Sequence, residues 1–89
     1  DIMKKRIAFK FKAPESAHLV KLCGSFTNWE KGAIYMEKGR AGEWKAQVNL
    51  DPGEYEYKFW VDGSWFNDPA ADRQAPNVWG SENSIRIVR

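Results

Sequence analysis

Cysteine and histidine are almost absent from this chain of 89 residues, in which Cys23 and His18 are the only members of their types. A single cysteine excludes an internal disulfide. One cysteine with one histidine also falls short of the ligands that a Cys/His zinc site needs. The glycines form no phosphate-binding pattern after a strand, so nucleotide binding has no support. We therefore expect neither a metal nor a cofactor.

Long apolar runs and a strong charge of one sign are missing as well. The apolar stretches are a few residues long, far below the roughly 20 residues of a transmembrane helix, and no secretory leader opens the chain. Its 14 basic and 12 acidic residues give a net charge of +2, and their interleaving argues against nucleic acid. The sequence thus predicts a domain without a membrane or nucleic-acid partner and, by exclusion, a cytoplasmic location.

A chain of this length leaves room for one sandwich of strands, so we expect residues 1–89 to form a single domain. The hydrophobic share of 43% and the charged share of 29% are those of an ordinary globular domain. Asp1 and Ile2 precede Met3. This start is compatible with a cloning remnant ahead of a natural start and equally with a piece cut from a longer protein.

Period-two alternation of apolar and polar residues dominates the chain, and no stretch is better described as a helix. The alternation predicts strands at 6–12, 18–23, 34–37, 44–50, 54–61, 64–66 and 84–88. Short strands separated by turns predict the all-β fold class, an immunoglobulin-like β-sandwich of about seven antiparallel strands. A five-stranded barrel is the alternative.

The connections between these strands carry their own signals. Asp51-Pro52-Gly53 has the residues of a turn that would return strand 54–61 antiparallel beside strand 44–50. Asp62-Gly63 is typical of a two-residue hairpin. Residues 67–83 hold few aliphatic side chains, so we expect one long ordered loop there.

Candidate catalytic groups lack suitable partners. His18 lies near Ser16, but no third residue is placed to orient the histidine as a base. Acidic pairs could serve glycoside hydrolysis, yet carboxylates at turns and on strand faces are usually solvated or capping groups. These pairs are Glu54 with Glu56 and Asp68 with Asp72. The sequence therefore predicts no catalytic residues and a domain that is not an enzyme.

Aromatic residues are the anomaly of the composition, because five tryptophans, three tyrosines and five phenylalanines make up 15% of the chain. A domain of this size buries only about two-thirds of its unfolded surface, so some rings must contact water. Clusters of exposed rings usually mark a binding surface. Three tryptophans lie at connections rather than in the interiors of long strands. Trp29 and Trp79 lie in loops, and Trp65 follows the Asp62-Gly63 turn. Together they predict an aromatic platform.

Such a platform suits sugars, because the C–H groups on the face of a pyranose ring pack against an indole while the hydroxyls stay in water. The hydroxyls then need polar partners. Lys58 offers a donor, and Asn83 offers both a donor and an acceptor. Trp44 falls on the buried face of its strand. Trp60 shares the outer face with Lys58 and stays unassigned, with contact to a neighbouring domain as one explanation.

Four segments occur in a recognisable order. They are Gly24-Ser25-Phe26-Thr27-Asn28-Trp29, Tyr57-Lys58-Phe59-Trp60-Val61-Asp62-Gly63-Ser64-Trp65, Asp68-Pro69, and Asn83 before the last strand. Over about residues 6–88 the chain resembles carbohydrate-binding module family 48, which includes the glycogen-binding domain of the β subunit of AMP-activated protein kinase and the early set domains of isoamylase and branching enzymes. The resemblance implies an immunoglobulin-like sandwich that binds α-1,4-linked glucan, such as glycogen or starch, without catalysis.

The resemblance also implies a role for each site residue. Trp29 and Trp65 would stack on sugar rings, and Lys58 and Asn83 would contact hydroxyls. Trp79 stands where the kinase domain has a leucine against the glucan, and its larger ring would either extend the platform or block a curved ligand. The expected partners are an α-glucan and an attached or associated enzyme or kinase. The alternative is a protein-docking domain that uses the same aromatic surface.

Overall fold

The computed structural model describes residues 3–89, and the expectation about Asp1 and Ile2 lies outside that range. A short 3₁₀ turn, η1 (Arg40–Gly42), comes directly before strand β5 (Glu43–Leu50). The strands are β1 (Lys5–Lys12), β2 (Val20–Gly24), β3 (Ile34–Tyr35), β4 (Glu37–Lys38), β5 (Glu43–Leu50), β6 (Gly53–Val61), β7 (Ser64–Phe66), β8 (Arg73–Pro76) and β9 (Glu82–Val88). The predicted all-β fold class is confirmed.

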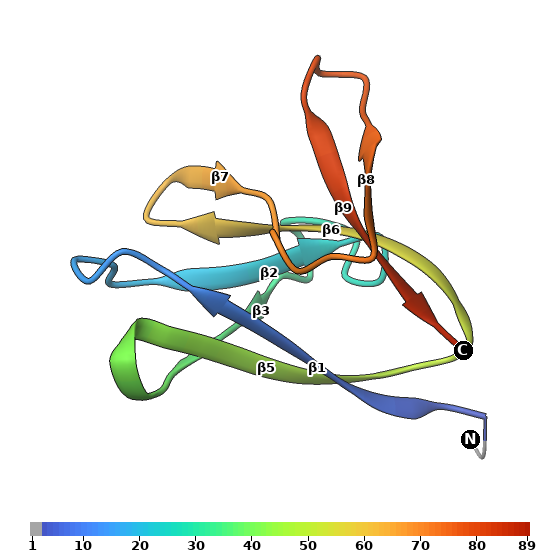
Figure 1. Ribbon diagram of the computed structural model, residues 1–89, viewed down its shortest axis with the longest axis horizontal. Coiled ribbons are helices and arrows are strands. Elements are labelled where there is room, and N and C mark those ends of the chain that lie inside the picture. The colour runs from blue at the N-terminus through green and yellow to red at the C-terminus, as the bar shows by residue number, and fades with distance from the viewer. Residues whose placement is uncertain (1–2) are drawn as a thin grey trace.

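These strands form two antiparallel sheets (Figure 1). The smaller sheet has the order β1-β5-β4, and the larger has the order β3-β2-β6-β9-β8 with β7 paired to β6. Strand β9 pairs with residues 53–57 of β6, and β7 pairs with residues 59–61 along the same edge. Lys58 therefore separates the part of β6 that pairs with β9 from the part that pairs with β7. The β6–β7 and β8–β9 hairpins diverge from this point in Figure 1.

The core lies between the sheets and is rich in aromatic rings. Phe11 of β1 stacks on Phe59 of β6 at a centroid distance of 4.5 Å, and Phe9 meets Tyr57 edge-on at 4.9 Å. These contacts join the two sheets, as the alternation of strands 6–12 and 54–61 predicts. Trp44 is 6% exposed and belongs to the same core, in agreement with its predicted packing role.

Two predicted connections are wrong. Strands β5 and β6 do not pair, because β5 lies between β1 and β4 while β6 lies between β2 and β9. The turn Asp51-Pro52-Gly53 instead carries the chain from one sheet to the other, which lets both strands bury apolar faces in one core. Residues 67–83 are not a single loop, since they contain β8, which pairs with β9 from Arg73↔Ile85 to Pro76↔Glu82.

The Asp62-Gly63 hairpin, by contrast, is confirmed. Its backbone φ angles are +45° and +96°, the left-handed pair that a two-residue hairpin turn needs, and Val61 pairs with Ser64 across it. The Asp62 carboxylate accepts the N–H groups of His18 at 2.9 Å and Leu19 at 2.8 Å. These bonds tie the hairpin to the entrance of β2 and thereby fix the base from which β7 projects.

A buried polar cluster holds the segment after β7 against three strands. Asp68, which is 5% exposed, accepts the Tyr57 hydroxyl at 2.6 Å and the Ala70 N–H at 2.9 Å. The Asp68 N–H donates to the Ser84 hydroxyl at 2.7 Å, and the Gln74 amide donates to the Asp68 carbonyl at 2.9 Å. The cluster therefore joins β6, β8 and β9 where the two hairpins separate.

This cluster predicts a dependence of stability on alkaline pH. Burial, followed by the hydrogen bond to Asp68, raises the pKa of the Tyr57 hydroxyl well above its ordinary value. The unfolded chain therefore loses this proton first. The contribution of Tyr57 is present in full below about pH 10 and is lost as the pH rises toward the folded pKa, by up to about 1.4 kcal/mol per pH unit.

Urea unfolding at several pH values above about 10 measures this contribution. Tyr57→Phe should make the free energy of unfolding fall less steeply with pH than in the unmodified domain. The matched control is Tyr35→Phe, whose ring is 64% exposed and which should leave the slope unchanged. Equal slopes in all three proteins would contradict the prediction.

Candidate functional site

A cleft of about 700 Å³ brings together the five residues that the sequence singles out. Its lining residues come from the loop after β2, from the β6–β7 hairpin and from the β8–β9 hairpin. Figure 1 shows the β8–β9 hairpin standing away from the sandwich. Three further residues line it that sequence reasoning missed. The complete lining is Trp29, Glu30, Lys58, Trp65, Asn77, Trp79, Ser81 and Asn83.

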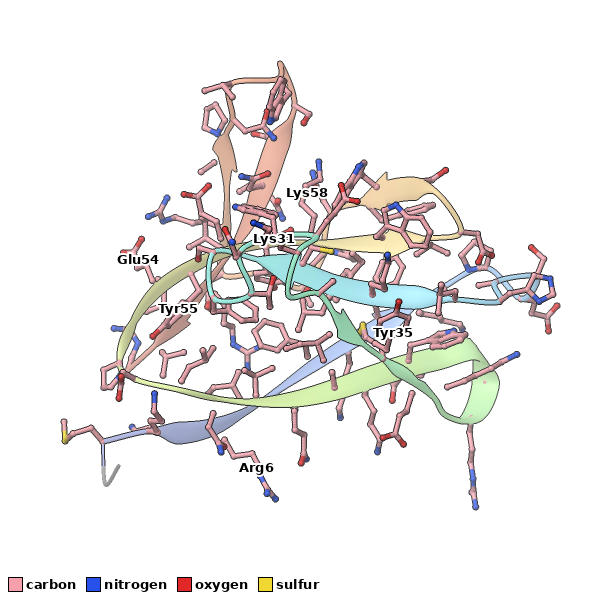
Figure 2. The ribbon with its side chains drawn as sticks, turned by 180° about the vertical axis from the view of Figure 1, so that it is seen from behind. Arg6, Lys31, Tyr35, Glu54, Tyr55 and Lys58 are labelled. Carbon is pink, nitrogen blue, oxygen red and sulfur yellow. The ribbon has the colours of Figure 1, made fainter. Side chains whose placement is uncertain are left out.

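Lys58 lies on β6 at the point where the β6–β7 and β8–β9 hairpins separate. It stands between the Tyr57↔Ser84 pair of β9 and the Phe59↔Phe66 pair of β7, on the outer face of β6. Figure 2 shows its side chain on the side of the sheet from which the β8–β9 hairpin rises. The ammonium donates to the Ser81 hydroxyl at 3.4 Å. Because an ammonium has three donors, two remain for a ligand.

The loop after β2 holds Trp29 in an unusual backbone conformation. Asn28 and Trp29 both have φ of +56°, a left-handed conformation that costs a bulky residue roughly 1–2 kcal/mol. The buried Thr27 stabilises it, since its hydroxyl accepts the Gly24 N–H at 3.0 Å and donates to the Trp29 carbonyl at 2.8 Å. Strain that is retained in this way is common at binding sites.

Gly24 allows this loop to approach β6. A Cβ atom at this position would lie 2.5 Å from the Glu56 carbonyl oxygen and 3.0 Å from the Tyr57 Cβ. Neither atom belongs to the flexible end of a side chain, so only glycine fits without a shift of the backbone. The first glycine of the recognised segment thus serves to place Trp29 over the cleft.

Two of the three rings of the cleft are exposed, and the third, Trp29, is partly buried. Trp65, opposite Trp60 in the β6–β7 pair, is 41% exposed, and Trp79 at the tip of the β8–β9 hairpin is 86% exposed. Gly80, with φ of +84°, provides the left-handed residue that closes this tip. Rings so exposed around one cleft are available to stack on a ligand.

Asn77 organises the tip that carries Trp79. Its Oδ1 accepts the N–H groups of Trp79 at 2.9 Å and Ser81 at 3.1 Å. Its Nδ2 donates to the Ser81 hydroxyl at 2.9 Å and to Asn83 Oδ1 at 3.0 Å. All four hydrogen-bonding positions of this amide are therefore used. An asparagine three residues before a glycine is a turn signal, but it does not indicate which bonds the amide forms in the folded hairpin.

The orientation of the Asn83 amide follows from this network. Its Oδ1 faces Asn77, and its Nδ2 donates to Glu56 Oε1 at 2.8 Å. Asn83 is 8% exposed, and it keeps one N–H and one lone pair free of these bonds. The floor of the cleft thus has donors and acceptors in fixed positions, which suits a ligand with paired hydroxyl groups.

Loss of the Asn77 amide should loosen the tip. In Asn77→Ala, the Trp79 and Ser81 amide hydrogens lose their side-chain acceptor, and we expect their exchange with solvent to accelerate by about tenfold. Asn77→Asp is the matched control because it keeps the acceptor oxygen. Hydrogen exchange followed by NMR distinguishes them, and equal rates in both variants would show that the side chain does not fix the tip.

The comparison with known families identifies the class of ligand. Residues 7–89 match the family described as the glycogen recognition site of AMP-activated protein kinase. The chain belongs to this family. It is therefore a glycogen-recognition domain, and the predicted resemblance and glucan-binding class are confirmed. A family of binding modules also favours the predicted absence of catalysis.

Relatives of this glycogen-recognition domain come from plants and animals. Protein PTST homolog 2, chloroplastic, of Arabidopsis thaliana is 40% identical over 75 residues, which cover 84% of this chain and 14% of the relative. Protein FLOURY ENDOSPERM 6, chloroplastic, of Oryza sativa is 41% identical over 69 residues, covering 78% and 12%. The rat 5'-AMP-activated protein kinase subunit beta-1 is 41% identical over 70 residues, covering 79% and 25%.

The predicted cytoplasmic location is contradicted by these relatives, since two of them are chloroplastic. The prediction rested on features that the sequence lacks, and this chain spans only 12–25% of the length of these three relatives. A recognition domain carries its binding surface, whereas the signals that set a compartment can lie elsewhere in a protein. No helix within residues 3–89 has the length and apolarity of a membrane span.

The acidic pairs considered as catalysts have structural partners. Asp68 is held in the buried cluster, and the Asp72 carboxylate accepts the Ile87 N–H at 2.6 Å. Glu54 forms an ion pair with Arg73, and Glu56 accepts from Asn83. Each of these four carboxylates thus serves the fold or the floor of the cleft.

Proposed function

We propose that this glycogen-recognition domain binds α-1,4-linked glucan in its cleft and catalyses no reaction. In this proposal Trp29 and Trp65 stack on glucose rings, Lys58 and Asn83 contact hydroxyls, and Trp79 extends the platform. The observation that carries the proposal is the convergence of these five residues on one cleft from four separate parts of the chain.

The chemistry of the cleft matches that of a glucan. Sugar C–H groups pack against exposed indoles, and the apolar area that they bury stabilises the complex. The free donors of Lys58 and Asn83 compete with water for the hydroxyls, so each bond contributes little net free energy. Two or three rings with such bonds should provide about 4 to 7 kcal/mol, a dissociation constant of roughly 1 mM to 10 μM.

An affinity of this size suits a tethering role. The relatives in which this domain occupies a small share of the chain include a protein kinase subunit. We propose that the domain keeps an attached or associated enzyme or kinase close to a polymer with many binding sites. Raising the effective concentration in this way requires only weak binding at each site.

Titration of intrinsic tryptophan fluorescence tests the proposal. β-Cyclodextrin, a ring of α-1,4-linked glucose, should cause a saturable change, and cellohexaose, its β-linked counterpart, should cause none. A response to both would contradict selectivity for the α linkage. A response to neither would contradict glucan binding in this cleft and favour docking of a protein through the same aromatic surface.

A further inference from the structure

A row of large side chains crosses the outer face of the larger sheet next to the cleft. Tyr35 of β3 lies opposite Lys21 of β2, Lys21 lies opposite Trp60 of β6, and Trp60 lies opposite Trp65 of β7. Directly opposite residues point to the same face of a sheet. The row therefore runs without a break from Tyr35 to Trp65, which also lines the cleft.

The contacts within the row are specific. The Lys21 ammonium lies 4.1 Å from the centre of the Trp60 ring and 5.7 Å from the centre of the Tyr35 ring. No carboxylate within the described residues forms a salt bridge with Lys21. Tyr35 remains 64% exposed. Trp60 thus positions the lysine beside an exposed ring, and the lysine donors stay available.

The other sheet shows that such a row is not a general feature of this fold. On its outer face, Lys10 of β1 lies opposite Lys45 of β5, and Arg6 lies opposite Asn49. Figure 2 shows Arg6 directed away from the sandwich. A solvent-facing sheet surface is usually polar in this way. Aromatic rings on the outer face of the larger sheet therefore indicate a binding surface.

We propose that Tyr35 and Lys21 form a second sugar subsite, which receives the part of a longer α-glucan chain that extends past Trp65. This inference rests on the proposed function of the cleft. The pairing of an exposed ring with a lysine repeats the combination of Trp65 and Lys58. Continuity through Trp65 identifies the occupant as the same glucan chain, and Trp60 acts as a positioning residue.

Chain length provides the test. Isothermal titration with maltotetraose and maltodecaose compares a ligand that occupies the cleft with one that reaches both subsites. Maltodecaose can also bind the cleft through more of its glucose units, which raises its apparent affinity. This statistical increase is the same in every variant, so it does not affect the comparison between variants. Tyr35→Ala and Lys21→Met should each weaken maltodecaose binding by about three- to tenfold and maltotetraose binding by less than about twofold.

The matched control for Lys21→Met is Lys10→Met, on the outer face of the other sheet, which should change neither affinity. A fluorine label on the tryptophans supplies an independent measurement, because the Trp60 signal should shift with maltodecaose and not with maltotetraose. Wild-type affinities for both ligands in Tyr35→Ala and Lys21→Met would overturn the subsite, as would equal losses for both ligands.

The two proposals can fail separately. If Trp29→Ala loses both ligands while Tyr35→Ala and Lys21→Met bind as the unmodified domain does, the second subsite is overturned and the cleft stands. If the unmodified domain binds neither oligosaccharide, the proposed function is overturned and the subsite with it.

Discussion

Trp65→Ala should weaken the binding of β-cyclodextrin by about 1 to 3 kcal/mol, roughly 5- to 150-fold, while the free energy of unfolding changes by less than about 1 kcal/mol. The ring of Trp65 is 41% exposed and lies outside the buried core. Its removal takes away a stacking surface without opening a cavity. Isothermal titration and urea unfolding of the same preparation measure the two effects.

The control for this prediction is the core tryptophan. Trp44→Ala removes a ring that is 6% exposed and should cost about 3 to 5 kcal/mol of stability. If Trp65→Ala also lost cooperative unfolding, Trp65 would have to be regarded as a core residue. Trp29→Ala should weaken binding and preserve the free energy of unfolding to the same extent as Trp65→Ala, because the backbone bonds of its loop do not depend on the indole.

Asp68→Ala should destabilise the domain by about 2 to 4 kcal/mol. The substitution leaves the Tyr57 hydroxyl and the Ala70 N–H without their acceptor, and Tyr57 is completely buried. A small domain is stable by only about 5 to 15 kcal/mol, so this loss is a large part of the total. Urea unfolding at neutral pH gives the value.

The matched control is Asp72→Ala in the same segment. Asp72 is exposed and accepts one N–H, that of Ile87, so its removal should cost less than about 1 kcal/mol. A cost for Asp68→Ala as small as that of Asp72→Ala would mean that the buried cluster contributes little to stability.

The sequence predicts which faces of the strands are buried better than it predicts which strands pair. Alternation places Phe9, Phe11, Tyr57 and Phe59 in the core, as the structure does, because burial of a side chain follows from local periodicity. Pairing depends on residues far apart in the chain. The turn before Gly53 is compatible with a hairpin and with a passage between sheets, and only the competing partners of β6 decide between them.

Strand β8 shows a second limit. Arg73, Gln74, Ala75 and Pro76 include no β-branched or aromatic residue, and their strand lies at the edge of its sheet. Neither composition nor alternation indicates such a strand. It forms because β9 offers its backbone and Asp68 holds the preceding segment in place.

The residues of the candidate site also fall into those that the sequence indicates and those that it does not. Large or charged residues with a clear physical use, such as Trp29, Trp65 and Lys58, could be selected from the sequence together with the family pattern. Asn77 and Ser81 could not, because small polar residues are common in any connection. Their role arises from hydrogen bonds that only the folded hairpin brings together.

The exposed apex of the β8–β9 hairpin bears on how this domain can diversify in evolution. Four side-chain bonds run among Asn77, Trp79, Ser81 and Asn83, and two more join Ser81 and Asn83 to β6. The residue at the apex, Trp79, contributes nothing to the core. In the proposed site, exchange of the apex residue can therefore alter ligand preference at little cost in stability, whereas exchange of the buried Tyr57 or Phe59 would disrupt the packing of the core. Selection can act on the tip while the sandwich stays constant.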